Sequence, residues 1–328
     1  MTINNNNIFG AFTLNEARGS RLTGDWLHTD MIANYGWFGG GGFGPLATVD
    51  RIDFSNDSST ASPRGSLSAV RGYLAATGNS NYGWFGGGAT PTIVSTVDRI
   101  DFSNDSSTAS PRGPLSSARY SLAATGNSNY GWFGGGFPGP KSTVDRIDFS
   151  NDSSTASVRG SLSAARYSSG ATGNSNYGWF GGGSPGPFST VDRIDFSNDS
   201  GTASPRGPLS SARYLLAATG NSNYGWFGGG SGPAAAELAT VDRIDFSNDS
   251  VTASPRGSLL SVGRFSLAAT GNSNYGWFGG SRQSGVPGSF RTVVNRIDFS
   301  NDTASNSRSI TPLTSMHEYA ATSNTPIG

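Results

Sequence analysis

The chain contains no cysteine. Disulfide scaffolds, thiolate metal sites, cysteine nucleophiles and copper-radical oxidases that need a cysteine–tyrosine crosslink are therefore excluded. Only two histidines are present, His28 and His317, and they lie far apart in the sequence. We expect no metal site and no cofactor.

Charge is also scarce, because charged residues make up 13% of the chain and the 22 basic and 22 acidic side chains cancel. This balance disfavours a nucleic-acid partner, which would need an excess of positive charge. No stretch of 18 apolar residues occurs, and the start, MTINNNNIFGAF, lacks the features of a signal peptide. We therefore expect no membrane insertion and no export, and hence a cytoplasmic protein unless it belongs to a particle.

Glycine and proline are abundant, at 48 and 16 residues, and the reason is an internal repeat. The phrase NYGWFGG occurs six times, with tryptophans 47 to 51 residues apart at Trp37, Trp84, Trp132, Trp179, Trp226 and Trp277. A phrase close to TVDRIDFSND follows each copy, and then one close to TASPRGPLSSAR. A period of this length is typical of propeller blades.

Each unit predicts four short strands and no convincing helix. In the second unit these are residues 74–79 (LAATGN), 81–87 (NYGWFGG), 96–102 (TVDRIDF) and 108–113 (TASPRG). Side chains alternate along a strand, so Trp84 and Phe85 point to opposite faces. Apolar residues on both faces predict that every sheet is covered on both sides, as between neighbouring blades.

The strand count predicts how the ring closes. Residues 34–324 hold six copies of the last three strands, but the first strand has only five internal copies, and the sixth is 319–324 (YAATSN). We expect this C-terminal strand to complete the first blade and remove an exposed edge. The prediction is an all-β protein, a six-bladed propeller over 34–328 with an arm over 1–33.

The order of these phrases resembles the kelch repeat, from the glycine-ended YGWFGG strand through VDRIDF to the PLSSAR stretch before the next unit. This resemblance implies a six-bladed propeller with four strands per blade, closed by a C-terminal innermost strand. One departure is that kelch repeats usually carry a tryptophan in the fourth strand, where this chain has Thr-Ala. The near-identical units are also similar to kelch-like proteins of tailed phages, particularly marine and cyanobacterial ones.

Several motifs with possible chemistry have structural alternatives. No GxxxxGK[ST] phosphate loop is present. The Asp-x-Ser-x-Asp spacing at Asp101, Ser103 and Asp105 resembles a calcium loop but lacks its glycine and glutamate, so we favour a capped turn. Pairs such as Arg99 and Asp101 are expected to form ion pairs within or between blades. Catalytic carboxylates should occur once per molecule, so we predict no catalytic residues and no enzyme.

An arginine precedes the first strand of each unit, and His317 takes its place in the last. By the kelch likeness these six positions circle the channel mouth, where they would grip an anionic glycan or phosphate. The alternative is that each arginine binds backbone carbonyls of the next blade. The candidate binding ring is Arg71, Arg119, Arg166, Arg213, Arg264 and His317.

Variation among the units concentrates in the loop between the second and third strands: GGFGPLA, GATPTIVS, GFPGPKS, GSPGPFS, GSGPAAAELA and GSRQSGVPGSFR. A fixed scaffold with variable loops on one face is typical of a binding surface, although relaxed selection would give the same pattern. The arm carries Phe9, Phe12 and Trp26, which would either cover the first blade or attach the propeller to an assembly.

Together these features predict a non-enzymatic phage virion component of the tail, baseplate or capsid surface. Its arm would contact other virion proteins and its loop face a host-surface glycan or protein. The alternatives are a soluble kelch-like protein adaptor and a sugar-acting propeller enzyme.

Overall fold

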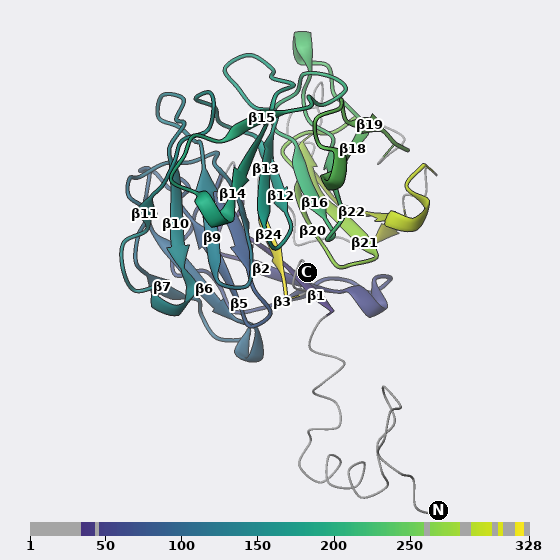
Figure 1. The fold of residues 1–328 in the computed structure, drawn as a ribbon. Helices are drawn as coiled ribbons and strands as arrows, with labels where there is room; N and C mark the ends of the chain where they lie inside the picture. The colour runs from purple at the N-terminus through teal and green to yellow at the C-terminus, as the bar shows by residue number, and fades with distance from the viewer. Residues whose placement is uncertain are drawn as a thin grey trace, which may run out of the picture.

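The computed structural model describes residues 34–42, 46–258, 263–282, 290–303, 308–310 and 319–324, and these form a six-bladed β-propeller (Figure 1). Each blade is a four-stranded antiparallel sheet, and the innermost strands surround a central channel. The six blades confirm the fold predicted from the repeat, and the architecture is consistent with a kelch-like propeller.

The strands of each blade succeed one another from the channel outward. Blade 1 has β24 (Ala320–Ser323), β1 (Tyr35–Gly39), β2 (Val49–Asp53) and β3 (Ser62–Pro63). Blade 2 has β4 (Ala75–Gly78), β5 (Tyr82–Gly86), β6 (Val97–Asp101) and β7 (Ser110–Arg112). Blade 3 has β8 (Ala123–Gly126), β9 (Tyr130–Gly134), β10 (Val144–Asp148) and β11 (Ser157–Val158).

The other three blades repeat this order. Blade 4 has β12 (Gly170–Gly173), β13 (Tyr177–Gly181), β14 (Val191–Asp195) and β15 (Ser204–Arg206). Blade 5 has β16 (Ala217–Gly220), β17 (Tyr224–Gly228), β18 (Val241–Asp245) and β19 (Ser254–Pro255). Blade 6 has β20 (Ala268–Gly271), β21 (Tyr275–Arg282), β22 (Phe290–Asp298) and β23 (Arg308–Ile310).

Both faces of each blade are covered, as the alternation of apolar residues predicted. Trp84 and Phe85 are adjacent on β5 and point to opposite faces, and neither has any exposed surface. Trp84 packs with Phe133 of blade 3, whereas Phe85 packs with Trp37 of blade 1. The hydrophobic core is thus a series of clusters between neighbouring blades.

Glycine in the second strand allows this close approach. A Cβ atom on Gly131 of β9 would lie 2.6 Å from Cγ2 of Thr77 in the preceding blade and 3.0 Å from the ring of Phe149. Since real Cβ atoms do not come that near, only glycine fits this position at the observed spacing of the blades.

A short 3₁₀ turn follows each third strand and differs from the sequence prediction. Phe102 was expected at the end of a strand, but it begins η3 (Phe102–Asn104). The other turns are η2 (Phe54–Asn56), η4 (Phe149–Asn151), η5 (Phe196–Asn198), η7 (Phe246–Asn248) and η8 (Phe299–Asn301), and a further one, η6 (Pro233–Ala235), lies in a loop of blade 5. The preceding aspartate caps the turn: Ser103 donates both its amide and its hydroxyl to Asp101 Oδ1.

This turn places an aromatic ring and a carboxylate against the preceding blade. Phe102 stacks on Trp37 with ring centroids 3.9 Å apart. Asp105, at the end of the same turn, accepts a 2.8 Å hydrogen bond from Trp37 Nε1 and pairs with Arg51 at 3.0 Å. The Asp-x-Ser-x-Asp motif therefore caps a turn and joins two blades, and the described residues contain no cluster of acidic and histidine side chains suited to a metal ion.

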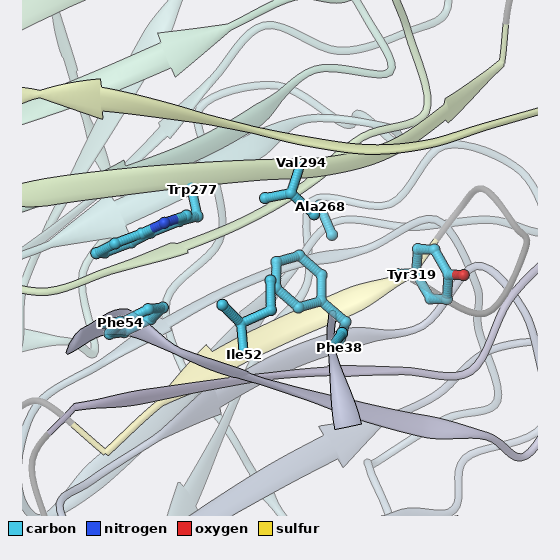
Figure 2. Close-up of a cluster of buried hydrophobic side chains, with 8 residues drawn as sticks. Phe38, Ile52, Phe54, Ala268, Trp277, Val294 and Tyr319 are labelled. Carbon is cyan, nitrogen blue, oxygen red and sulfur yellow. The ribbon is translucent and has the colours of Figure 1, made fainter. Parts of the chain in front are cut away.

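The predicted ring closure is confirmed. Strand β24 pairs antiparallel with β1, with Trp37 opposite Thr322 and Phe38 opposite Ala321. At the seam between blades 6 and 1, Phe54 stacks on Trp277 at 3.9 Å, and Phe38 packs edge-on against Tyr319 (Figure 2). The seam uses the same kinds of contact as the other blade interfaces.

Among the described segments, none is a helix with the length and apolar character needed to cross a membrane.

Candidate functional site

The arginines before each innermost strand are interior residues. Arg71, Arg119, Arg166, Arg213 and Arg264 are each at most 1% exposed. They lie in the connections that lead from the outermost strand of one blade to the innermost strand of the next.

Each of these guanidinium groups is enclosed by polar groups of the blade that follows. Arg71 pairs with Asp98 at 2.6 Å and donates to the carbonyl oxygens of Thr96 at 2.7 Å and Gly87 at 3.0 Å. Burial lowers the pKa of the Arg71 guanidinium, and the Asp98 carboxylate opposes that shift. The carboxylate also accepts from the amide and hydroxyl of Ser68, so the pair is tied to the connection itself.

This arrangement recurs with one variation. Arg119 pairs with Asp145, Arg166 with Asp192 and Arg213 with Asp242, at 3.0 to 3.2 Å and without exposed side-chain surface. In blade 6 the carboxylate is replaced by Asn295, whose side-chain oxygen accepts from Arg264. The repeat thus tolerates a neutral partner at one blade.

The predicted arginine ring is therefore corrected. The five described guanidinium groups bind a carboxylate or amide and backbone carbonyls of the next blade, and they leave no exposed cationic surface to grip an anion. The sixth position, His317, lies outside the described residues, and so do Phe9, Phe12 and Trp26 of the arm. Arg71 lies four residues before Ala75. The same count back from Ala320 shows that Met316, rather than His317, holds the equivalent position in the last unit.

The central channel is an uncharged cavity of about 350 Å³. Its wall is formed by the six innermost strands, which read Ala-Ala-Thr-Gly except for Gly-Ala-Thr-Gly in blade 4 and Ala-Ala-Thr-Ser in blade 1. Asn79, Asn127, Ser128 and Ser175 line one end. None of its lining residues is charged. The threonines of these strands, such as Thr77, are buried and pack against glycines of the next blade.

A partial ring of backbone hydrogen bonds lies around the opposite end of the channel, where the described residues join five of the six blades. Ser121 N donates to Tyr73 O, Ser168 N to Ser121 O, Leu215 N to Ser168 O and Ser266 N to Leu215 O, at 2.7 to 2.8 Å. All five residues have φ between 54° and 59°, the left-handed region that few non-glycine residues adopt. They line a shallow hollow of about 80 Å³. This partial ring could not be predicted from the sequence, because its hydrogen bonds join main-chain atoms, which carry no residue-type signal.

The variable loops of blades 2 to 5 lie on the same side of the molecule as this partial ring and are held at both ends. In blade 3, Phe137 and Tyr120 exchange two backbone hydrogen bonds of 2.9 Å, which tie the loop to the connection before β8. Arg166 N donates to Lys141 O at 2.8 Å, which ties the other end of the loop to the next connection. Residues 88–95, 183–189 and 230–239 are anchored by similar bridges. These loops, the connections and the channel mouth are called the loop face below.

Four of the buried arginines are followed directly by an aromatic residue that is only partly buried: Tyr120, Tyr167, Tyr214 and Phe265. The sequence analysis did not single these out, although the repeated Arg-Tyr and Arg-Phe pairs are a visible signal. Because a strand or bridge alternates its side chains, a buried arginine places its neighbour on the outer side.

The chain matches no protein-family model and no curated protein sequence.

Proposed function

We propose that the protein is a non-enzymatic interaction protein whose loop face binds a partner. The observation that carries this proposal is that recurring residues and variable residues occupy different parts of the structure. Most of the charged and aromatic residues that recur between units pack blade against blade, whereas the loops that differ between units stand on one face. Binding surfaces are commonly built in this way, as variable loops on a uniform scaffold.

The absence of catalytic function is part of the proposal. The recurring carboxylates of the described blades either join blades, as Asp98 and Asp105 do, or cap a turn, as Asp101 does, and each occurs in nearly every blade. General acid–base chemistry needs a carboxylate in a singular environment. A sugar-acting enzyme is therefore the less favoured alternative.

We further propose that the protein is a component of a tailed-phage particle, in the tail, baseplate or capsid surface. The similarity of the repeat to kelch-like phage proteins supports this assignment. Residues 1–33, with Phe9, Phe12 and Trp26, would attach the propeller to other virion proteins, and the loop face would contact a host-surface glycan or protein. Deletion of residues 1–33 should abolish incorporation into particles, whereas a soluble adaptor would keep its partner without them.

The loop-face proposal is tested by binding of the purified full chain to bacterial-envelope extracts and to a panel of purified envelope glycans. In a loop-levelled variant, the loops between the second and third strands of the other five blades are replaced by GSPGPFS, the loop of blade 4. A matched control carries Ser80→Ala, Ser128→Ala and Ser175→Ala, three exposed changes in turns at the opposite end of the blades. Binding that is lost in the loop-levelled variant and kept in the control supports the proposal, and binding equal in all three proteins contradicts it.

A further inference from the structure

Four aromatic rings form a row on the loop face across blades 2, 3 and 4, each T-shaped or tilted against the next, with interplanar angles of 59° to 65°. The ring centroids of Tyr73 and Tyr120 are 5.7 Å apart, those of Tyr120 and Phe137 are 5.5 Å apart, and those of Phe137 and Tyr167 are 5.3 Å apart. We call this row the aromatic arc. Tyr73 also lines the shallow hollow at the channel mouth, so the arc begins there and runs outward.

The arc is separate from the packing of the blades. All four rings are partly buried and keep contact with solvent. None of them belongs to the six clusters of buried apolar residues between blades, which the described tyrosines at other repeat positions, such as Tyr82, do join. Contiguous aromatic surface that the fold does not use is typical of a recognition site.

Among the described residues, the arc occurs once on a scaffold that is otherwise repetitive. The position of Phe137 is Ala89 in blade 2 and Ser184 in blade 4, where the same bridge to the connection forms. The position of Tyr73 is Ser121 in blade 3. A singular cluster on a sixfold scaffold defines one site per chain, which the recurring residues do not.

The backbone holds this site in place before any ligand binds. Phe137 and Tyr120 are joined by their pair of backbone hydrogen bonds, and Tyr167 and Ser184 exchange a second pair of the same kind. Tyr73 O accepts from Ser121 N in the partial ring of hydrogen bonds at the channel mouth. Rings held by such contacts lose little conformational freedom on binding, which favours affinity.

Charge narrows the class of ligand. The loop and connections that carry the arc hold the buried arginines and Lys141, which is the single lysine of the chain. They also hold Arg64 and Arg159, which are partly exposed and lie 3.6 Å from the carboxylates of Asp105 and Asp199. A strongly anionic partner would find little to bind. Aromatic rings instead offer an apolar face to the C–H groups of a sugar ring, and tyrosine hydroxyls add hydrogen bonds at the edge.

We propose that the aromatic arc is a stacking platform for a neutral glycan built of pyranose rings. This inference rests on the proposed function of the loop face and specifies its ligand. Successive rings of the arc would pack against successive sugars of one chain, and the serines of the hollow, such as Ser121, would meet the hydroxyls of its end.

The test is affinity electrophoresis of the full chain through gels containing dextran, mannan or galactan as neutral probes and alginate as the acidic probe. The variants are Tyr120→Ser and Tyr167→Ser, with Tyr214→Ser as the matched control, because Tyr214 holds the same position in blade 5 but lies outside the arc. Lys141→Gln tests the charge. Thermal melting checks that each variant folds, which we expect because these rings lie outside the core clusters.

We expect at least one neutral polysaccharide to retard the protein, and each arc substitution to raise the dissociation constant roughly tenfold or more. Tyr214→Ser and Lys141→Gln should leave it unchanged. Retardation by alginate alone, sensitivity to Lys141→Gln, or no retardation by any neutral probe overturns the inference. Envelope binding that depends on the loops but is unaffected by Tyr120→Ser and Tyr167→Ser overturns the inference and leaves the proposed function standing. If the protein binds no envelope component at all, both the inference and the proposed function are contradicted.

Discussion

The substitution Asp105→Ala isolates the contact that joins one blade to the next. It removes the acceptor of the buried Trp37 indole N–H, a 2.8 Å hydrogen bond, and the partner of Arg51 at 3.0 Å. A buried donor left without a partner costs about 1–3 kcal/mol. The ion pair adds at most about 1 kcal/mol, because the Arg51 side chain is 22% exposed. We therefore expect a loss of about 1–4 kcal/mol in the free energy of unfolding.

Urea unfolding followed by tryptophan fluorescence and far-ultraviolet circular dichroism measures this loss. The control is Ser106→Ala in the same turn, where an exposed hydroxyl donates to Asn104 at 3.3 Å, and its effect should stay within about 0.5 kcal/mol. If Asp105→Ala shifts the midpoint no more than Ser106→Ala does, the carboxylate does not join the blades and the reasoning is refuted.

Three further outcomes follow from the packing. Gly131→Ala should lower the melting temperature because its Cβ would overlap Thr77, whereas Gly201→Ala, with no atom within 4 Å of its Cβ, should leave the temperature unchanged or raise it slightly. Arg119→Met should cost about 3–5 kcal/mol in urea unfolding, because the buried Asp145 carboxylate loses its cation, and the double variant Arg119→Met, Asp145→Asn should recover part of that cost. Burial, and to a smaller extent the nearby Asp50 carboxylate, raises the pKa of the Tyr319 hydroxyl. The stability that this protonated hydroxyl contributes is therefore complete below about pH 10 and is lost as the pH rises above that value. Melting curves from pH 8 to 11 should then show a shallower alkaline decline for Tyr319→Phe, and an identical decline would contradict the buried position of this ring.

The repeat made the fold predictable because every level of the sequence agrees with it. The six tryptophan phrases indicated six blades, and their spacing indicated the length of one blade. The apolar residues on both sides of the strand at Trp84 and Phe85 indicated that both faces are covered. The missing sixth internal copy of the first strand pointed to 319–324 as the closing strand. Such agreement between local pattern and global architecture is what lets a sequence specify one structure.

The site was less predictable because its residues act through tertiary geometry. Arg119 and its counterparts have the composition of an exposed cationic ring, but the connection that carries them turns inward and presents the guanidinium groups to carbonyls and Asp145. Their burial could be known only once the blades were placed. Likewise, the row formed by Tyr120, Phe137 and Tyr167 draws on two different repeat positions, which become neighbours only through the bridge between loop and connection.

The closed ring positions the loops, the channel mouth and the aromatic arc, so every proposed role depends on it. Its most direct test is thermal melting of a chain ending at residue 315, beside the intact chain. Without β24, strand β1 loses its inner partner and the seam loses Tyr319 and Ala321. We predict a much lower melting temperature or the loss of a single cooperative transition, with partial recovery on adding a peptide of residues 316–328. A truncated chain that melts cooperatively at the temperature of the intact protein would show that the C-terminal strand does not close the propeller.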